Sequence, residues 1–141
     1  MAQRFVPDPR QIDIGLAVLR IVTGIVFAMH GYQKFFTMGI PGVTGFFTQL
    51  GIPLPHVFAI VVASFELFGG IALILGLFTR LIAVPLAIDM LVAIILFHSR
   101  HGFFVPQGIE FVTTLMASCI ALAFAGPGTI SIDRILGRTP N

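Results

Sequence analysis

The sequence predicts an all-α integral membrane protein, a four-helix bundle with a short interfacial helix between the first and second spans. Apolar residues make up 57% of the 141 positions and charged residues only 10%, whereas soluble domains have about 25% charged residues. Four apolar stretches approach the ~20 residues that a helix needs to cross a bilayer. Each stretch also holds ionisable residues, which inside a membrane must face protein and not lipid.

The elements follow one another in a simple order. Residues 1–13 form a polar lead, and Asp13 at its end is a suitable N-cap for the first helix. The transmembrane domain covers residues 14–125, and a polar tail covers residues 126–141. The apolar stretches are helices because only a helix pairs all its backbone groups within one segment in lipid. The predicted spans are residues 14–36, 56–78, 81–98 and 109–125.

The connections between the spans differ in length. Residues 37–55 join the first two spans and contain apolar residues at helical spacing between proline-rich ends, which predicts a short amphipathic helix in the membrane interface. Its apolar residues are Val43, Phe46, Phe47 and Leu50. Only Thr79 and Arg80 separate the second and third spans, so these two helices form a tight hairpin.

The basic residues predict the orientation. With four spans, both termini and the tip of the hairpin lie on the same side of the membrane. That side carries Arg4, Arg10, Arg80, Arg134 and Arg138, and the opposite side carries Lys34 and Arg100. The excess of Arg and Lys on one side marks it as cytoplasmic. The net charge is only +2 and no basic cluster occurs, so nucleic acid is not an expected partner.

Depth in the membrane divides the buried charges into two groups. Counted from the cytoplasmic end of each predicted span at ~1.5 Å per residue, Arg20 lies ~9 Å deep and Asp89 ~12 Å deep. We therefore predict an Arg20–Asp89 ion pair that fixes the register of two helices. The group in the outer, periplasm-facing half is larger, and its members are His30, Lys34, Glu66, Glu110 and His98.

The outer group is our candidate ligand or proton site. His30 and Lys34 are one turn apart and share a face of the first helix. A histidine and a carboxylate beside an apolar wall could bind a quinone head group and exchange protons with it. The alternative is a purely structural cluster that locks the helices together.

Other chemistries have less support. His30, Glu66 and Glu110 could hold a metal ion only if three helices converged, and we predict no metal. A haem needs two axial ligands that face each other across the bundle, and His30 and His98 lie at different depths. Cys119 is alone, so it is expected to be a small packing residue. Nucleotide-binding loops and nucleophile elbows are missing from the sequence.

The segment LRIVTGIVFAMHGYQKFF contains an Arg, a Gly, then His-Gly followed by Lys and an aromatic residue, and the segment FELFGGIALILGLFTRL follows later in the chain. These segments resemble the first and second helices of the DoxX family of small bacterial membrane proteins. GFFTQLGIPLP resembles its interfacial segment, GIEF the opening of its fourth helix and AGPG its closing turn. The likeness covers about residues 15–135 in the same order. Asp89 departs from the family pattern, where apolar residues are expected.

The resemblance implies a multi-pass protein of the bacterial inner membrane. Relatives in this family are linked to thiosulfate or quinol oxidation, to oxidative-stress complexes or to quinone resistance. Our main hypothesis is therefore a redox-associated membrane subunit with quinone as the candidate cofactor. Besides the lipid bilayer, its candidate partners are other membrane redox subunits or a second copy of the chain. The competing hypothesis is a structural or assembly subunit without chemistry of its own.

Overall fold

The computed structural model describes residues 8–138, and the regular elements of this part of the chain are all helical. The elements in order are α1 (Pro9–Tyr32), η1 (Gln33–Thr37), α2 (Gly39–Gln49), α3 (Pro55–Leu75), α4 (Thr79–Leu96), η2 (His98–His101), α5 (Glu110–Ala125) and α6 (Ile132–Ile135). Three segments, α1 with η1, α3 and α4, are long and apolar enough to cross a membrane, and α5 is a shorter apolar helix. The predicted all-α membrane bundle is confirmed.

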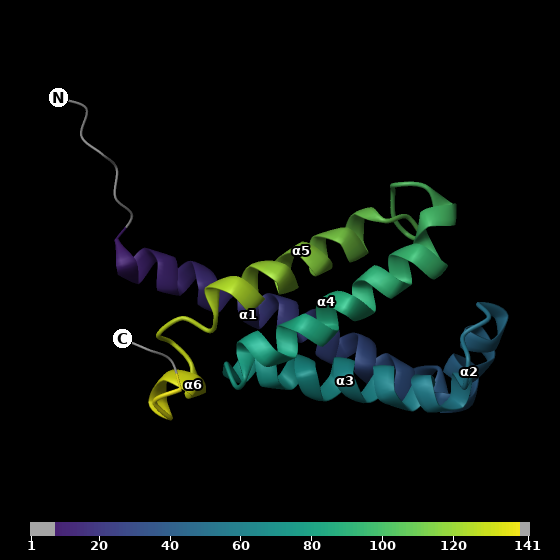
Figure 1. Cartoon of the computed structure of the whole chain (residues 1–141), viewed down its shortest axis with the longest axis horizontal. Coiled ribbons are helices and arrows are strands. Elements are labelled where there is room, and N and C mark those ends of the chain that lie inside the picture. Colours follow the sequence, from purple (N-terminus) through teal and green to yellow (C-terminus); the bar gives the residue numbers. More distant parts are fainter. Residues whose placement is uncertain (1–7, 139–141) are drawn as a thin grey trace.

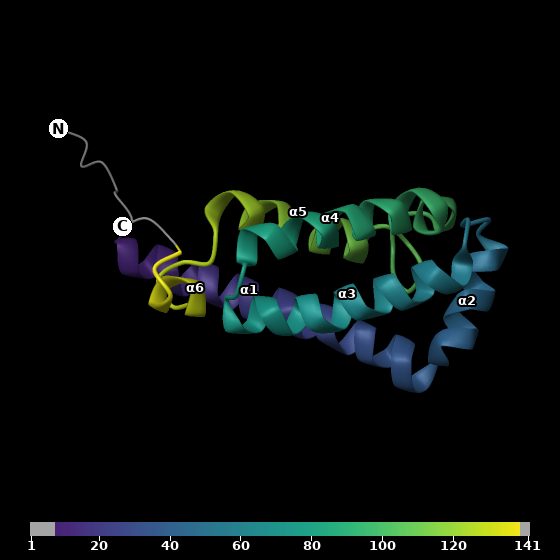
Figure 2. The ribbon, with the colours of Figure 1, turned by 60° about the horizontal axis from the view of Figure 1, so that its bottom comes forward.

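The bundle consists of two helical pairs. Helix α1 packs mainly against α3, and α4 packs mainly against α5 (Figure 1). Turning the molecule shows the two pairs as layers, with α2 at one end (Figure 2). We call the end with α2 and η2 the distal end, and the end with the start of α1 and α6 the proximal end. The bundle surface bears large exposed apolar side chains, including Val18, Phe68, Leu81 and Phe124, as expected for helices facing lipid.

Glycines allow α1 and α3 to approach closely. A Cβ atom added to Gly24 would lie 2.6 Å from the carbonyl oxygen of Gly70, and one added to Gly31 would clash with the backbone of Leu67. Membrane helices commonly use such small residues where their backbones meet, because packing and not water exclusion drives their association. This contact fixes the register of α1 against α3, and it brings Lys34 close to Glu66.

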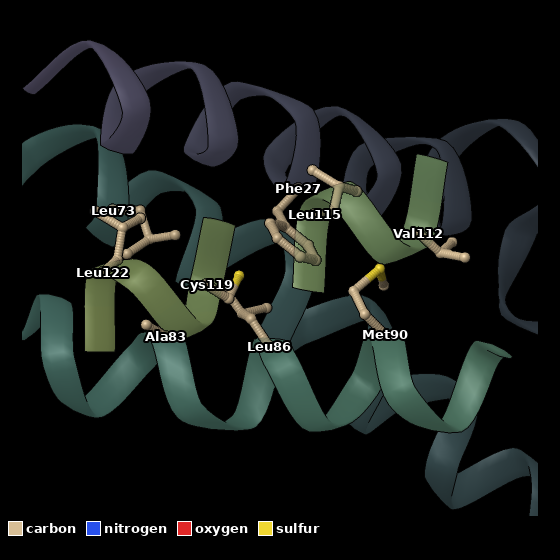
Figure 3. Packing of buried hydrophobic residues seen from close by; sticks show 9 residues of the cluster. All are labelled: Phe27, Leu73, Ala83, Leu86, Met90, Val112, Leu115, Cys119 and Leu122. Atoms are coloured by element: carbon tan, nitrogen blue, oxygen red, sulfur yellow. The ribbon is translucent and has the colours of Figure 1, made fainter. Parts of the chain in front are cut away.

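An apolar core joins the two pairs. Phe27 of α1 and Leu73 of α3 meet the inward faces of α4 and α5 there, as Figure 3 shows. The buried residues of α4 and α5 in this core are Ala83, Leu86, Met90, Val112, Leu115, Cys119 and Leu122. Cys119 is fully buried and packs as a small apolar residue, as predicted.

The start of the first helix differs from the prediction. Helix α1 begins at Pro9, and its N-cap is Asp8, whose carboxylate accepts a hydrogen bond from the backbone nitrogen of Arg10 at 2.9 Å. The assignment of Asp13 as the N-cap was therefore wrong, and residues 9–13 of the predicted polar lead are helical. Proline is favoured at the first helical position because its missing N–H would be unpaired there in any case. Residues 1–7 of the lead lie outside the described part.

The predicted amphipathic helix between the first two spans is present as α2. Val43 and Phe47 are buried on one face and pack against Ala59 of α3. The opposite face is exposed, including Gly42, Gly45 and Gln49. The helix thus lies across the distal end of the α1–α3 pair, in the connection where the helical spacing of apolar residues predicted it.

Candidate functional site

An ion pair between α3 and the segment after α1 forms the centre of the site. The ammonium nitrogen of Lys34 donates a hydrogen bond to Oε2 of Glu66, 2.5 Å away. Glu66 lies near the middle of α3 and is only 3% exposed. The side chain of Lys34 is 19% exposed, so the pair is buried at its acidic end and reaches the surface at its basic end.

The position of Lys34 depends on an unusual backbone segment. Residues Gln33–Thr37 form the π-helical turn η1 directly after α1. A π-turn is wider than an α-turn and shifts the angular position of the residues that follow it. Gly31, one turn before Lys34, sits against the Leu67 backbone. The close approach at Gly31 and the wider turn after it bring the long Lys34 side chain back to Glu66.

Asp89 is the third charged residue of this centre. Its carboxyl group is within hydrogen-bonding reach of the Glu66 carboxyl and interacts electrostatically with Lys34. Its Oδ2 atom is buried and has no hydrogen-bond partner among residues 8–138. Three ionisable groups from η1, α3 and α4 therefore converge, and we call them the Lys34–Glu66–Asp89 cluster.

His30 lies one helical turn before Lys34 and is held in a fixed orientation. Its Nδ1 atom donates to the carbonyl oxygen of Val26 at 2.9 Å, which means that Nδ1 carries a proton because a carbonyl can only accept. The ring also stacks on Phe111 of α5, with 5.9 Å between the ring centroids. Nε2 makes no hydrogen bond within the described residues, so it remains available to a ligand.

Glu110 and His98 were predicted to join this group, but their hydrogen bonds serve the distal loop. Oε1 of Glu110 accepts from the backbone nitrogen of Val105 at 2.6 Å. Nδ1 of His98 donates to the carbonyl oxygen of Gln107 at 2.6 Å. Both side chains thus hold the connection between α4 and α5 in shape. The structure brings together Lys34, Glu66 and Asp89, and it gives neither Glu110 nor His98 a bond to them.

The predicted Arg20–Asp89 ion pair is wrong. Arg20 is 2% exposed and its Nη2 atom donates to the carbonyl oxygen of Ile130 at 2.7 Å. Its guanidinium group lies directly on Gly76, at the proximal end of α3. Asp89 instead contacts Glu66. The two residues therefore stand at different heights in the bundle.

The predicted Arg20–Asp89 pair is wrong because the ends of the helices are not level with one another. Helix α3 ends at Leu75 and α4 begins at Thr79, so at ~1.5 Å per residue Glu66 and Asp89 are both ~14 to 15 Å from the α3–α4 turn. Arg20 packs on Gly76 beside this turn although it is eleven residues into α1, so α1 extends past the turn and its start is not level with the ends of α3 and α4. Correct helix ends place Asp89 opposite Glu66.

A second polar cluster closes the proximal end. The carboxylate of Asp133 accepts hydrogen bonds from the backbone nitrogens of Phe78 at 3.0 Å and Thr79 at 3.1 Å. It thereby caps α4, whose own N-cap residue makes no side-chain bond. Arg138 lies 3.8 Å from Asp133 and stacks over the Phe78 ring. We call Arg20, Asp133 and Arg138 the proximal cluster.

No pattern in the sequence indicated the role of Asp133. Its partners in the backbone are more than fifty residues earlier, and no helical periodicity links the tail to the α3–α4 turn. Asp13 has a similar role, since its carboxylate accepts from the backbone nitrogen of Thr129 at 3.1 Å and from its hydroxyl at 2.7 Å. These two acidic residues hold the tail against the helix ends.

The arrangement at the Lys34–Glu66–Asp89 cluster suits proton exchange and hydrogen bonding to a small polar group. It combines one cation and two carboxyl groups, and one helical turn before Lys34 the imidazole of His30 stacks on the ring of Phe111. Within residues 8–138, no three His, Cys, Asp or Glu side chains are close enough to hold a metal ion.

A compact helical bundle with apolar outer faces and an internal ion cluster defines a small multi-pass membrane protein. The sequence profile of the DoxX family matches residues 15–99, and the chain belongs to this family. No solved structure is similar enough to the chain to count as a match.

Similar proteins from two bacteria align with most of this chain. A Bacillus subtilis protein named "Putative oxidoreductase CatD" is 36% identical over 124 residues, which cover 88% of this chain and 88% of that protein. Inner membrane protein YphA of Escherichia coli is 32% identical, with 89% of this chain and 96% of YphA covered. Inner membrane protein YqjF of the same organism is 34% identical, with 89% and 95% covered.

Proposed function

We propose that this protein is a redox-associated, quinone- or quinol-linked membrane subunit. The observation that carries the proposal is the Lys34–Glu66–Asp89 cluster, which holds more charged groups than a single helix-locking pair requires and leaves a buried carboxyl oxygen without a further partner. Ionisable residues inside a membrane are costly and usually serve transport, proton transfer or ligand binding. The name of the Bacillus subtilis relative, which contains the word oxidoreductase, agrees with this class.

The residues divide the work by their chemistry. Because Nδ1 of His30 carries the proton that it donates to Val26, Nε2 of the neutral ring can accept a hydrogen bond from the hydroxyl of a quinol head group. Glu66 exchanges the proton, and Lys34 stabilises negative charge on the ring oxygen or on Glu66. Phe111, stacked on His30, supplies an apolar wall for the ring. Small-molecule sites typically combine such a wall with a few oriented polar groups.

The proposed setting is the bacterial inner membrane, with both termini in the cytoplasm. The two Escherichia coli relatives are inner membrane proteins by name, and the arginine excess at the proximal end supports the orientation. The distal end would then face the periplasm, and other membrane redox subunits or a second copy would be the partners. An alkaline phosphatase fusion at Asn141 is expected to be inactive, and an active fusion would reverse this topology.

Quinone binding by the purified protein tests the proposed function. Protein extracted from its host in mild detergent should carry a quinone detectable by mass spectrometry, and added ubiquinone or menaquinone should raise its melting temperature. Glu66→Gln should reduce the shift at the same quinone concentration. Glu110→Gln is the matched control, because the amide oxygen can still accept the bond from Val105 and the residue has no bond to the cluster. A wild-type protein without bound quinone and without a quinone-dependent shift would refute the proposal.

A structural role is the second candidate, and one observation favours it. The Lys34–Glu66 bond and the glycine contacts at Gly31 and Gly70 join the same two helices. A subunit of this kind would use its charges only to fix α1 against α3. The double variant His30→Gln, Glu66→Gln distinguishes the two, since a folded variant with an unchanged cellular phenotype would indicate scaffolding.

A further inference from the structure

The environment of Asp89 contains more acid than its basic partner can neutralise. Glu66 of α3 and Lys34 of η1 lie next to it, and Cys119 of α5 is close enough to interact with it electrostatically. Cys119 is a buried thiol and brings no positive charge. His30 of α1 lies one helical turn before Lys34, and its ring is held against Phe111.

Hydrogen-bond chemistry sets a condition on the two carboxyl groups. An ionised carboxylate has only acceptor atoms, so two of them cannot share a hydrogen bond unless one carries a proton. Lys34 already donates to Oε2 of Glu66. A hydrogen bond between the neighbouring carboxyl groups of Glu66 and Asp89 therefore requires a proton on one of them.

Charge counting gives the number of protons. Lys34 contributes one positive charge, and Glu66 and Asp89 would contribute two negative charges if both were ionised. The resulting net charge of −1 would lie between apolar helices, where an uncompensated charge is strongly unfavourable. One proton makes the cluster neutral, whereas a second would leave it with a surplus positive charge.

We propose that Glu66 and Asp89 share one resident proton and that this pair, with Lys34 as its counter-ion, is the proton-exchange site of the protein. Asp89 is thereby assigned a role in the site that the family resemblance does not supply, since its position departs from the family pattern. The buried Oδ2 atom of Asp89 marks the place where a further proton can be bound.

The exchange step is an acid–base reaction, and its link to quinol rests on the proposed function. When a quinol hydroxyl meets the cluster, its O–H bond breaks and a new O–H bond forms on the ionised carboxylate of the pair. The electron pair of the broken bond stays on the quinol oxygen, so nothing is oxidised or reduced in this step. The pair then returns its extra proton to water by way of the partly exposed Lys34 side.

Infrared spectroscopy of the full chain in lipid nanodiscs, without quinone, tests the proposal. At neutral pH the wild-type protein should show the C=O band of one protonated carboxyl group, shifted by exchange into D₂O. Asp89→Asn and Glu66→Gln should each remove this band, because one carboxylate then balances Lys34. Lys34→Met should double it, because two carboxyl groups without a cation need two protons. Glu110→Gln should leave it unchanged.

Three results would overturn the proposal: no such band in the wild-type protein, a band that survives in both Asp89→Asn and Glu66→Gln, or loss of the band when choline chloride is replaced by sodium chloride. The last result would identify a sodium ion as the occupant. The wild-type spectrum alone is decisive if a variant fails to fold. If the wild-type protein shows the band but does not bind quinone, the proposed proton site stands and only its link to quinone is refuted.

Discussion

The two polar clusters of this protein use the same residue types for different purposes. In the proximal cluster, Asp133 bonds the first backbone nitrogens of α4 and Arg20 bonds the carbonyl oxygen of Ile130. In the Lys34–Glu66–Asp89 cluster, the side chains interact mainly with one another. Both clusters keep buried polar atoms without a hydrogen-bond partner among residues 8–138, Oδ2 of Asp89 in one and Nε and Nη1 of Arg20 in the other. Charges that pair with backbone groups hold helix ends, whereas charges that meet each other inside a membrane can exchange protons and bind a ligand.

The largest effect should follow from breaking the proximal cluster. Asp133→Ala removes two hydrogen bonds from a charged acceptor and the cap of α4, which should lower the free energy of unfolding by about 3 kcal/mol. Denaturant titration in detergent micelles measures this loss. Quinone binding by the remaining folded protein should not change, and a selective loss of binding would show that the two clusters are not separate in function.

A smaller loss of stability is expected from a substitution at the contact between α1 and α3. Gly31→Val places side-chain atoms against the Leu67 backbone, and overpacking of this kind should cost about 2 kcal/mol. Because this contact aligns Lys34 with Glu66, ligand binding should weaken as well. Gly15→Val is the control, since a Cβ atom there meets nothing within 4 Å. Equal melting temperatures for the two variants would contradict the close approach.

The next effect in size concerns quinone affinity at the Lys34–Glu66–Asp89 cluster. Glu66→Gln keeps the shape of the side chain but removes its charge, and the weaker hydrogen bond should reduce quinone affinity about 10-fold, equal to ~1.4 kcal/mol. Isothermal titration of the wild-type and variant proteins measures the ratio. The fold should be retained, as judged by circular dichroism, and unaltered affinity would remove Glu66 from the site.

The smallest effect should be at Asp13. Its bonds to Thr129 hold the tail at an exposed position, where competing water reduces the gain to about 0.5–1 kcal/mol. Asp13→Ala should therefore lower the melting temperature only slightly. The protease sensitivity of the tail should rise in the same variant, and an unchanged cleavage rate would show that Asp13 does not hold the tail.

Much of the fold was predictable because membrane helices depend on apolar length. The stretches ending near Phe36, Phe78, His98 and Ala125 all became helices, and the spacing of Val43 and Phe47 predicted α2. The helix ends were less accurate. Asp8 with Pro9 was a stronger start signal than Asp13, and the sequence did not indicate that α1 extends past the α3–α4 turn, beside which Arg20 lies.

The site was predictable only in part, for two physical reasons. Lys34 and Glu66 were expected in one group because both depart from the apolar pattern at similar depth, and they form an ion pair. The partner of Asp89 was missed because a small error in helix ends changes which residues lie at equal height. Glu110 and His98 bond the backbone of the distal loop, and loop conformation leaves no periodic pattern in the sequence.

The capping of α4 by the tail has a consequence for synthesis. Asp133 follows the backbone groups that it caps by 54 and 55 residues, which at 5–20 residues per second means a delay of roughly 3–10 s on the ribosome. During that interval the turn between α3 and α4 is already synthesised, but the Asp133 carboxylate that accepts its hydrogen bonds is not. Water or the insertion machinery must therefore accept the hydrogen bonds of these backbone nitrogens. A chain that stops before Ser131 would keep this turn open permanently, and cellular proteases that survey membrane proteins would have a way to recognise it as unfinished.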